Sequence, residues 1–400
     1  MRIPLVLLLA LAAALAGATP AAATVIEVET LVIVDGGTFP PCELDEAILS
    51  ANDDFGVGGC SKGDGADVIV FDVEGTIELP AELPTIEEDL TIRGPGADEL
   101  TLDAEQLGRI LRVAPGVTLT LEGVTLANGA VPAGNGGALL LDPGSTVVLR
   151  DCRITGSQAA NGGGVYANEA QLRIERCLLD GNEASAQGGA LYARDADVEL
   201  VNTTLSGNAA QEGGGLAVVD AGDPGLVTLH SVTLAENEAD EGGQLLVTGD
   251  AEVQLRHTLL AEAVSGGHCA GAVTSLDYNL SDDDGCALDG EHDLVVAGAG
   301  IGPLADNGGP TATHALLEGS PAIDAGATRC RDGQDVLLET DQRGAGFPRV
   351  TDGDDVPGAL CDIGAYEAAP EPAAAAGAAA ALAALAALAR ARRHRLPSRA

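Results

Sequence analysis

Aromatic residues are scarce in this 400-residue chain, which has no tryptophan, four tyrosines and four phenylalanines. Flat aromatic rings are the usual platforms on which proteins stack sugar rings. Their scarcity therefore weighs against a carbohydrate-binding groove, and with it against an enzyme that cleaves polysaccharides.

Cationic residues are also scarce, since 20 lysines and arginines stand against 61 acidic residues. Six of the arginines lie at the chain ends, Arg2 and five between positions 390 and 399, which leaves 14 cations in the body. Such a charge repels phosphate backbones and anionic membranes, so we expect no nucleic-acid partner. The acidic surface would attract divalent cations or basic partners, or it serves only to keep an extracellular protein soluble.

The first 23 residues have the pattern of a secretory signal peptide. They contain one cation, Arg2, an apolar run Leu5–Leu15, and Ala21 and Ala23 in an A-x-A site. The apolar run is shorter than the ~20 residues that span a bilayer, which makes a transmembrane anchor the weaker interpretation. We therefore predict cleavage before Thr24 and export of the chain.

Eight cysteines in an exported chain predict disulfides, because the compartments outside the cytosol are oxidising. Their spacing favours four local pairs. None has the C-x-x-C spacing of a zinc site, so a zinc site has little support. The eight are Cys42, Cys60, Cys152, Cys177, Cys269, Cys286, Cys330 and Cys361.

Glycine doublets recur through the middle of the chain, each followed by a short apolar run. They fall at Gly136, Gly163, Gly188, Gly214 and Gly242, at intervals of 27, 25, 26 and 28 residues. An aliphatic row repeats with the same period at Leu121, Leu149, Ile174, Leu200, Leu229 and Leu255. A second row follows five residues beyond each of these, at Leu126, Ile154, Leu179, Leu205, Leu234 and Leu260. Two registers with one period of about 26 residues identify a repeat architecture.

Each repeat alternates apolar and polar residues with period two, as in VELVNTTLSGN, which is typical of β-strands. No stretch within a repeat has the pattern of an amphipathic helix, which argues against a leucine-rich repeat. The sequence therefore predicts an all-β fold, a single-stranded right-handed parallel β-helix with coils ~4.8 Å apart. We assign residues 24–99 to an N-terminal cap and first coils, 100–300 to the regular coils and 301–368 to a closing segment.

Residues one coil apart should stand directly above one another. One such row is mixed in type and rich in residues that tolerate a bend, and we name it the bend row: Gly123, Asp151, Arg176, Asn202, Ser231 and His257. In the next row Cys152 and Cys177 lie one coil apart. That separation is compatible with a disulfide, and two buried free thiols are an equal alternative.

Two further sets of stacked residues predict specific contacts. Asn182, Asn208 and Asn237 predict an internal ladder of amide side chains, each satisfying the backbone of its neighbours. Tyr166 and Tyr192 are one coil apart and should stack on each other.

The stretch Cys42–Asp53 predicts a helix that caps the open end of the coils, because its apolar residues have helical spacing. Its pattern C-x-L-x-E-A-I resembles the CSLREA domain at the start of many secreted bacterial β-helix proteins. Glu43 and Asp45 stand where that domain has Ser and Arg, so its basic residue is lost.

Residues 302–327, GPLADNGGPTATHALLEGSPAIDAGA, and residues 361–367, CDIGAYE, resemble the closing motifs of the choice-of-anchor Q family. The combined resemblance covers most of residues 24–368 and implies a pectate-lyase-like β-helix whose members carry assorted surface anchors. It implies no reaction, because that fold hosts enzymes and non-enzymes alike. We expect Cys330 and Cys361 to tie this closing segment to the body.

Residues 369–400 resemble a PEP-CTERM sorting signal. Pro370, Glu371 and Pro372 precede the alanine-rich run Ala373–Ala389, and a cluster follows that contains Arg390, Arg392, Arg393 and Arg395. Cations after an apolar helix fit the positive-inside rule. The resemblance implies an exosortase-like processing enzyme as partner and transient membrane anchoring through the tail of a bacterial surface or extracellular protein. A permanent single-span anchor is the alternative.

The sequence shows no set of catalytic residues that repeats at coil spacing. Lyases of this architecture need calcium held by acidic residues beside a basic residue, and hydrolases need clustered aspartates. The only acid of the bend row is Asp151, and with Arg176 on the next coil it predicts a surface ion pair. The acidic loops at 282–284 and 352–355 lack EF-hand spacing, so calcium has only weak support as a cofactor. The histidines at 230, 257, 268, 292 and 314 share no register and have no Ser or Cys partner in a recognisable motif.

We therefore assign no catalytic, cofactor-binding or metal-ligating residue from the sequence. The favoured hypothesis is a non-catalytic surface or matrix protein, structural or adhesive, which contacts extracellular polysaccharide or another surface protein. The alternative is a polysaccharide lyase or glycoside hydrolase. It predicts a groove along the coils lined by at least three carboxylates, or by carboxylates with an arginine.

Overall fold

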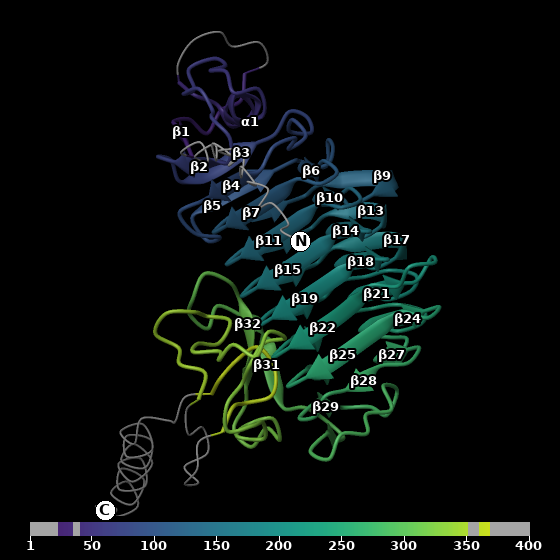
Figure 1. Ribbon diagram of the computed structural model, residues 1–400. Helices are drawn as coiled ribbons and strands as arrows, with labels where there is room; N and C mark the ends of the chain where they lie inside the picture. The colour runs from purple at the N-terminus through teal and green to yellow at the C-terminus, as the bar shows by residue number, and fades with distance from the viewer. Residues whose placement is uncertain (1–22, 35–40, 351–359, 369–400) are drawn as a thin grey trace, which may run out of the picture.

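The computed structural model describes residues 23–34, 41–350 and 360–368, and it is a parallel β-helix (Figure 1). Successive coils contribute strands to three long sheets in which every pairing is parallel, so the predicted fold is confirmed. The predicted sorting residues lie outside the described residues, and so does the signal peptide apart from Ala23. Within the described ranges no helix is long and apolar enough to cross a membrane.

The first and second sheets have ten strands each, and the third has seven. The first sheet contains β1 (Val25–Val28), β2 (Asp67–Phe71), β4 (Leu90–Arg93), β7 (Thr118–Glu122), β11 (Thr146–Arg150), β15 (Gln171–Glu175), β19 (Asp197–Val201), β22 (Leu226–His230), β25 (Glu252–Arg256) and β28 (Thr274–Ser275). The second contains β3 (Gly75–Glu78), β5 (Leu100–Asp103), β8 (Thr125–Ala127), β12 (Arg153–Thr155), β16 (Leu178–Asp180), β20 (Thr204–Ser206), β23 (Thr233–Ala235), β26 (Leu259–Ala261), β29 (Leu280–Ser281) and β30 (Leu294–Val295). The third contains β6 (Leu111–Val113), β10 (Leu139–Leu141), β14 (Val165–Asn168), β18 (Leu191–Arg194), β21 (Leu216–Val219), β24 (Leu245–Thr248) and β27 (Cys269–Ala270).

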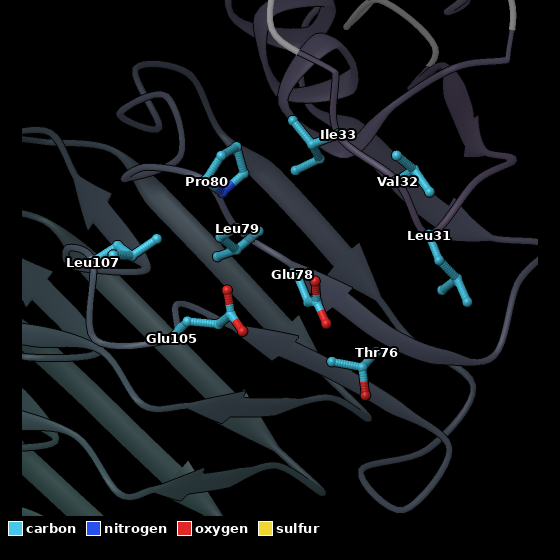
Figure 2. A pocket seen from close by; sticks show the side chains of 9 residues that line it. All are labelled: Leu31, Val32, Ile33, Thr76, Glu78, Leu79, Pro80, Glu105 and Leu107. Atoms are coloured by element: carbon cyan, nitrogen blue, oxygen red, sulfur yellow. The ribbon is translucent and has the colours of Figure 1, made fainter.

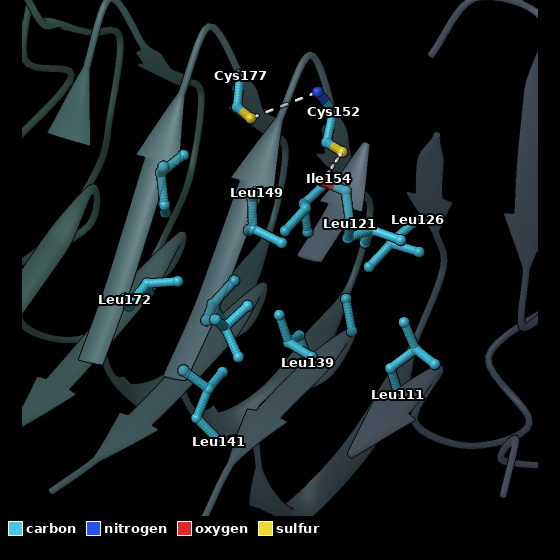
Figure 3. Packing of buried hydrophobic residues seen from close by; sticks show 14 of the residues in the cluster. Leu111, Leu121, Leu126, Leu139, Leu141, Leu149, Cys152, Ile154, Leu172 and Cys177 are labelled. Atoms are coloured by element: carbon cyan, nitrogen blue, oxygen red, sulfur yellow. Dashed lines mark hydrogen bonds between the residues drawn. The ribbon is translucent and has the colours of Figure 1, made fainter. Parts of the chain in front are cut away.

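Both predicted aliphatic rows run vertically through the interior. Leu149 is the partner of Leu121 on one side and of Ile174 on the other, and Ile174 pairs with Leu200. The second row is equally continuous, since Ile154 pairs with Leu126 on one side and with Leu179 on the other. These side chains are buried and converge between the sheets (Figure 3).

The bend row connects the first sheet to the second, and all six of its residues have left-handed backbone with φ between 47° and 63°. Only Gly123 takes this conformation without steric cost. For the others, hydrogen bonds between stacked bends compensate: Asp151 N donates to Glu175 O over 3.1 Å and Arg176 N to Val201 O over 3.0 Å. The expected bend is therefore confirmed.

Cys152 and Cys177 are stacked and buried, but they are free thiols. The backbone N–H of Cys152 points at the Sγ of Cys177 over 3.4 Å (Figure 3). The expectation of a fourth disulfide is thus wrong, and the alternative of two small apolar side chains in a narrow interior holds. The other six cysteines pair locally as Cys42–Cys60, Cys269–Cys286 and Cys330–Cys361.

The asparagine ladder is confirmed and is longer than predicted. Asn208 Oδ1 accepts from the backbone N–H of Asn182 over 3.0 Å, and Asn237 Oδ1 accepts from that of Asn208 over 2.9 Å. Ser157 continues the ladder at one end, and Gln244 at the other. The ladder satisfies buried backbone groups where the coil turns out of the second sheet.

Each glycine doublet follows a turn that connects the second sheet to the third. Three of these turns contain the strands β9 (Ala130–Asn135), β13 (Gln158–Asn161) and β17 (Glu183–Gln187). Gly188 has φ +70°, and a Cβ on Gly189 would lie 2.3 Å from the carbonyl oxygen of Gly214 in the next coil. On the neighbouring strands β14 and β18, Tyr166 and Tyr192 stack as predicted, with ring centroids 5.0 Å apart.

The predicted capping helix is α1 (Leu44–Asn52), which lies beside β1 and β2 at the N-terminal end (Figure 1). Its apolar face is fully buried, with Leu44, Ala47 and Ile48 at 0% exposure. Glu43 begins the helix, and its N–H donates to the Glu46 carboxylate over 3.4 Å. The Cys42–Cys60 disulfide ties the helix start to the following loop.

The closing segment, residues 301–368, has little regular structure apart from the antiparallel pair β31 (Ile301–Ala305) and β32 (Thr313–Leu316). It does not merely cover the last coil. Its chain turns back along the side of the β-helix and lies beside β19, β22 and β25 (Figure 1).

Candidate functional site

The closing segment is fixed to the coils along the bend row and the start of the second sheet. Asn202 Nδ2 donates to Thr340 O over 2.9 Å, and Thr204 Oγ1 donates to Gln342 Oε1 over 2.6 Å. Further along, Thr233 Oγ1 accepts from the backbone N–H of Ala365 over 2.9 Å. These contacts fix the closing segment to two successive coils.

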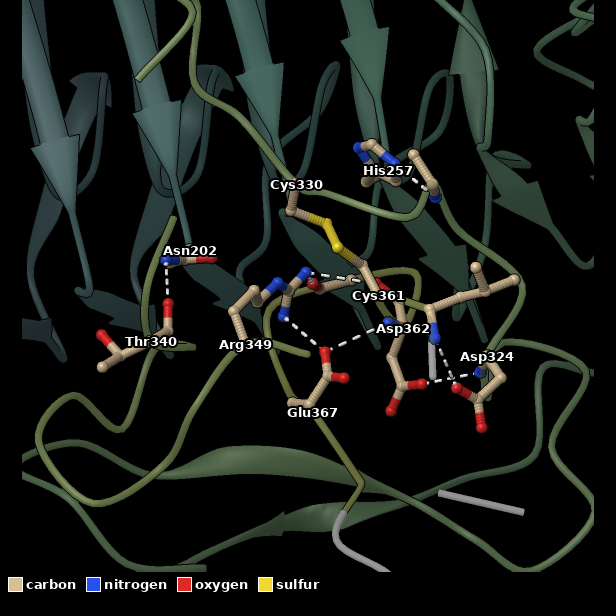
Figure 4. Close-up of a disulfide and its surroundings, with 12 residues drawn as sticks. Asn202, His257, Asp324, Cys330, Thr340, Arg349, Cys361, Asp362 and Glu367 are labelled. Atoms are coloured by element: carbon tan, nitrogen blue, oxygen red, sulfur yellow. Dashed lines mark hydrogen bonds and ion pairs between the residues drawn. A yellow bond between two sulfur atoms is a disulfide. The ribbon is translucent and has the colours of Figure 1, made fainter. Parts of the chain in front are cut away.

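A disulfide and a buried arginine hold the closing segment together (Figure 4). The Cα atoms of Cys330 and Cys361 are 6.1 Å apart, so the predicted pairing is confirmed, but both cysteines lie within the closing segment, and the expectation that their bond ties it to the body is wrong. The bond closes a loop within the closing segment, and Gly326 N donates to Cys361 O over 2.8 Å. Arg349 is fully buried beside it and donates to the carbonyl of Asp362 over 3.2 Å. Burial raises the pKa of the Asp362 carboxyl to about 6.

Arginine and glutamate alternate up the outer edge of the first sheet, in a row that pairs Arg93, Glu122, Arg150 and Glu175 on successive coils. We call this row the charge ladder. Glu122 lies 2.9 Å from Arg93 and 3.1 Å from Arg150, and Arg150 lies 3.5 Å from Glu175. Burial alone would raise the pKa of Glu122, but the hydrogen bonds from both arginines lower it. The ladder is therefore charge-balanced along its length.

A groove of about 540 Å³ crosses the outer face of the first sheet beside the closing segment. Arg173 lines it, forms an ion pair with Glu199 and donates to Asp332 Oδ2 over 3.0 Å. The loop that carries Asp332 completes the wall, because Gly333 N donates to Glu199 Oε1 over 2.9 Å and Gln334 Nε2 to its Oε2 over 2.6 Å. This is the feature that the enzyme hypothesis predicts, carboxylates with an arginine in a groove along the coils.

The groups in this groove already have partners. Asp197, the other carboxylate of the lining, accepts from Leu226 N over 3.0 Å. Arg173 faces three carboxylates, those of Glu199, Asp332 and Glu175. An arginine in such surroundings stays protonated, so it is a poor general base. Across the described ranges no three His, Cys, Asp or Glu side chains are arranged to hold a metal ion.

The predicted pair Asp151 and Arg176 is present and is bidentate, with both N–O distances 2.8 Å. The hydrogen bonds that Arg176 donates to Asp151 raise the pKa of Arg176, which also pairs with Glu175. Both residues line a shallow pocket whose opposite wall belongs to the closing segment. There Arg343 lies between the rings of Phe347 and Tyr366, 4.0 and 3.8 Å from their centroids. The bidentate ion pair of Arg176 and the cation–π contacts of Arg343 are of the kind that anchor a loop.

One histidine does have a serine partner, which the sequence did not reveal. Ser206 Oγ lies 2.9 Å from His314 Nε2, and His314 Nδ1 bonds to the carbonyl of Gly302 over 2.8 Å. The carbonyl fixes the proton on Nδ1, so the serine hydroxyl donates to Nε2. The residues are 108 positions apart, and only the fold brings them together. Both are at most 2% exposed, so the pair is shielded from solvent in the folded protein.

Three further histidines contact a turn or a stacked ring. His268 Nε2 lies 2.5 Å from Asp282, whose loop had been a weak calcium candidate. Asp283 in the same loop accepts from two backbone N–H groups. His292 and His257 sandwich the ring of Tyr278, at centroid distances of 4.6 and 5.3 Å. The carboxylates of Asp282 and Asp283 are therefore used in bonds to His268 and to the backbone of Gly285.

A second groove of about 540 Å³ lies at the N-terminal end, between β3 and the extended segment that follows β1 (Figure 2). Its walls are mainly apolar, with Leu31, Val32, Leu79 and others, and two carboxylates, Glu78 and Glu105, point into it. Within the described part of the chain, its lining contains no histidine, cysteine, lysine or arginine.

No protein-family model, curated protein or solved structure matches this chain.

Proposed function

We propose that this protein is a non-catalytic β-helix protein of the bacterial cell surface or extracellular matrix, with a structural or adhesive role. The observation that carries the proposal is the pairing of charges on the outer face of the first sheet. Along the charge ladder and in the groove beside it, each arginine is paired with carboxylates, and the carboxylates are bound by arginines or backbone N–H groups. Such ion pairs connect successive coils, and in the ladder and the groove they leave no unpaired acid and base for catalysis.

Export is part of the same proposal. The signal peptide and the PEP-CTERM-like tail support it from the sequence, and three disulfides suit an oxidising compartment. An exosortase-like enzyme would then process the tail near Pro370, Glu371 and Pro372, and the body would contact polysaccharide or another surface protein. The intact mass of protein from the envelope fraction tests this step. A mass that retains the arginine cluster would contradict processing.

An activity assay tests the non-catalytic role directly. Purified residues 24–368 would be incubated with polyuronates and neutral polysaccharides, with calcium and with a chelator, and unsaturated products and reducing ends would be measured. We expect neither product. A product formed by the wild type and lost on Arg173→Gln, but kept by Arg93→Gln at the exposed end of the charge ladder, would overturn the proposal.

A polysaccharide lyase or hydrolase is the second candidate, favoured by one observation only, the groove that contains Arg173, Asp197 and Glu199. Binding separates it from a purely structural role. An enzyme should bind oligosaccharides in that groove, so Asp197→Asn and Glu199→Gln should weaken binding. An adhesin that binds through its acidic turns should keep its affinity in both variants.

A further inference from the structure

The bend row and the closing segment enclose buried polar side chains that the proposed function does not use. We call them the junction cluster: His230, Ser231, Arg256 and His257 on the coils, and Arg349 on the closing segment. Their exposed fractions are 2%, 0%, 1% and 0% for His230, Ser231, His257 and Arg349, and Arg256 is half-buried. Such groups are normally hydrogen-bonded when they are buried.

The fold makes these side chains neighbours. His230 and Arg256 are partners in β22 and β25, and Ser231 N donates to Arg256 O over 3.0 Å. Gly364 links Arg349 to His257, because its carbonyl accepts from Arg349 and its own N–H donates to His257 O over 2.8 Å. Figure 4 shows Arg349 beside the Cys330–Cys361 disulfide, with its ion pair to Glu367 as a dashed line. Consistently, burial and then the charges of Arg349 and Arg256 lower the pKa of His257 to about 3.

Hydrogen-bond donors outnumber acceptors in the junction cluster. His257 Nε2 accepts from Ala327 N over 3.0 Å, so the neutral ring carries its proton on Nδ1. That N–H, the Nε and Nη1 of Arg349, the Nε of Arg256 and the Ser231 hydroxyl are buried without a hydrogen-bond partner in the described part of the chain. The Glu367 carboxylate lies 3.8 Å from Arg349 Nη1, beyond hydrogen-bond distance.

We propose that the junction cluster binds a small inorganic oxyanion of the sulfate or phosphate type. Guanidinium forks match the geometry of tetrahedral oxyanions, and an imidazole N–H and a hydroxyl supply further donors. Arg173 and Arg176 each have close carboxylate partners, and Arg349 pairs with Glu367 at 3.8 Å, whereas Arg256 has none within ion-pair distance among the described residues. The charge of Arg256 therefore favours an anion here, although the chain as a whole carries a formal charge of −41. The anion would hold the closing segment to two successive coils.

A titration with sulfate tests the proposal. Residues 24–368 would be equilibrated in sodium gluconate, and sodium sulfate would be added in the low millimolar range at constant ionic strength. We expect a saturable rise in melting temperature of about 3 °C at ten times the dissociation constant, and a matching binding isotherm by calorimetry. Phosphate should give the same response, and chloride a smaller one.

Two variants separate a site from a general salt effect. Arg256→Gln removes one guanidinium at a half-buried position and should lose the saturable response. Arg93→Gln changes an exposed arginine of the same vertical row, far from the closing segment, and should keep it. A response of equal size in wild type and Arg256→Gln would overturn the proposal. So would no saturable response in the folded wild type, because water would then satisfy the donors.

Discussion

Replacing Asn208 by alanine should cost the β-helix about 4 kcal/mol of unfolding free energy. Its side chain is 1% exposed and bridges two coils. The substitution removes the acceptor of Asn182 N, at 3.0 Å, and a donor to Leu179 O, at 2.9 Å. It thus leaves one backbone donor and one backbone acceptor short of a partner in the interior, at about 1–3 kcal/mol each. The effect would be measured from the midpoint of equilibrium urea unfolding, with the slope checked for constancy.

Asn161→Ala is the matched control, because Asn161 also bonds to an asparagine one coil away but is half-buried. Its Nδ2 donates to Asn135 Oδ1 over 3.0 Å, and water can replace that bond. The control should lose less than about 1 kcal/mol. If both variants shifted the midpoint equally, the amide ladder would not be an internal support, and the reasoning would be refuted.

Three further predictions concern the cysteines and one carboxyl group. Reducing agent should lower the melting temperature, because a loop the size of that between Cys330 and Cys361 contributes about 4 kcal/mol; a melt unchanged by reductant in wild type and in the double Ser variant would contradict this. Thiol titration without reductant should find no reactive thiol in the native protein and two, Cys152 and Cys177, after denaturation; zero after denaturation would restore the fourth disulfide. The folded state raises the pKa of Asp362 from 3.8 to about 6, so it binds the proton more tightly than the unfolded chain and loses stability as pH rises through this window. The stability of wild type relative to Asp362→Asn should fall between those pH values, and a difference independent of pH would count against the assignment.

The coils could be predicted from the sequence because each coil repeats the same local pattern. Leu149 and Ile174 are 25 residues apart, and a constant period converts that spacing into vertical contact. The same repeat period predicted the bend row and the asparagine ladder. It did not predict the state of Cys152 and Cys177, because register places two sulfur atoms near each other but does not decide whether they bond.

The path of the closing segment could not be predicted, because nothing in it repeats. Ser206 and His314 are 108 residues apart, and Arg173 and Asp332 are 159 apart. Their contacts depend on one long return of the chain along the bend row. The groove and the junction cluster arise from that return, so neither has a signal in the sequence alone.

Directed cross-linking tests the vertical register most directly. Thr120 and Val148 are partners in β7 and β11, where adjacent strands lie about 4.8 Å apart, within the Cα range of a disulfide. Cysteines at these two positions should form an intramolecular disulfide under mild oxidation, seen by mass spectrometry of peptides. Cysteines at Thr120 and Thr146, which lies two residues off register, should not. Cross-linking of the second pair in preference to the first would contradict the stacking of coils on which the whole account rests.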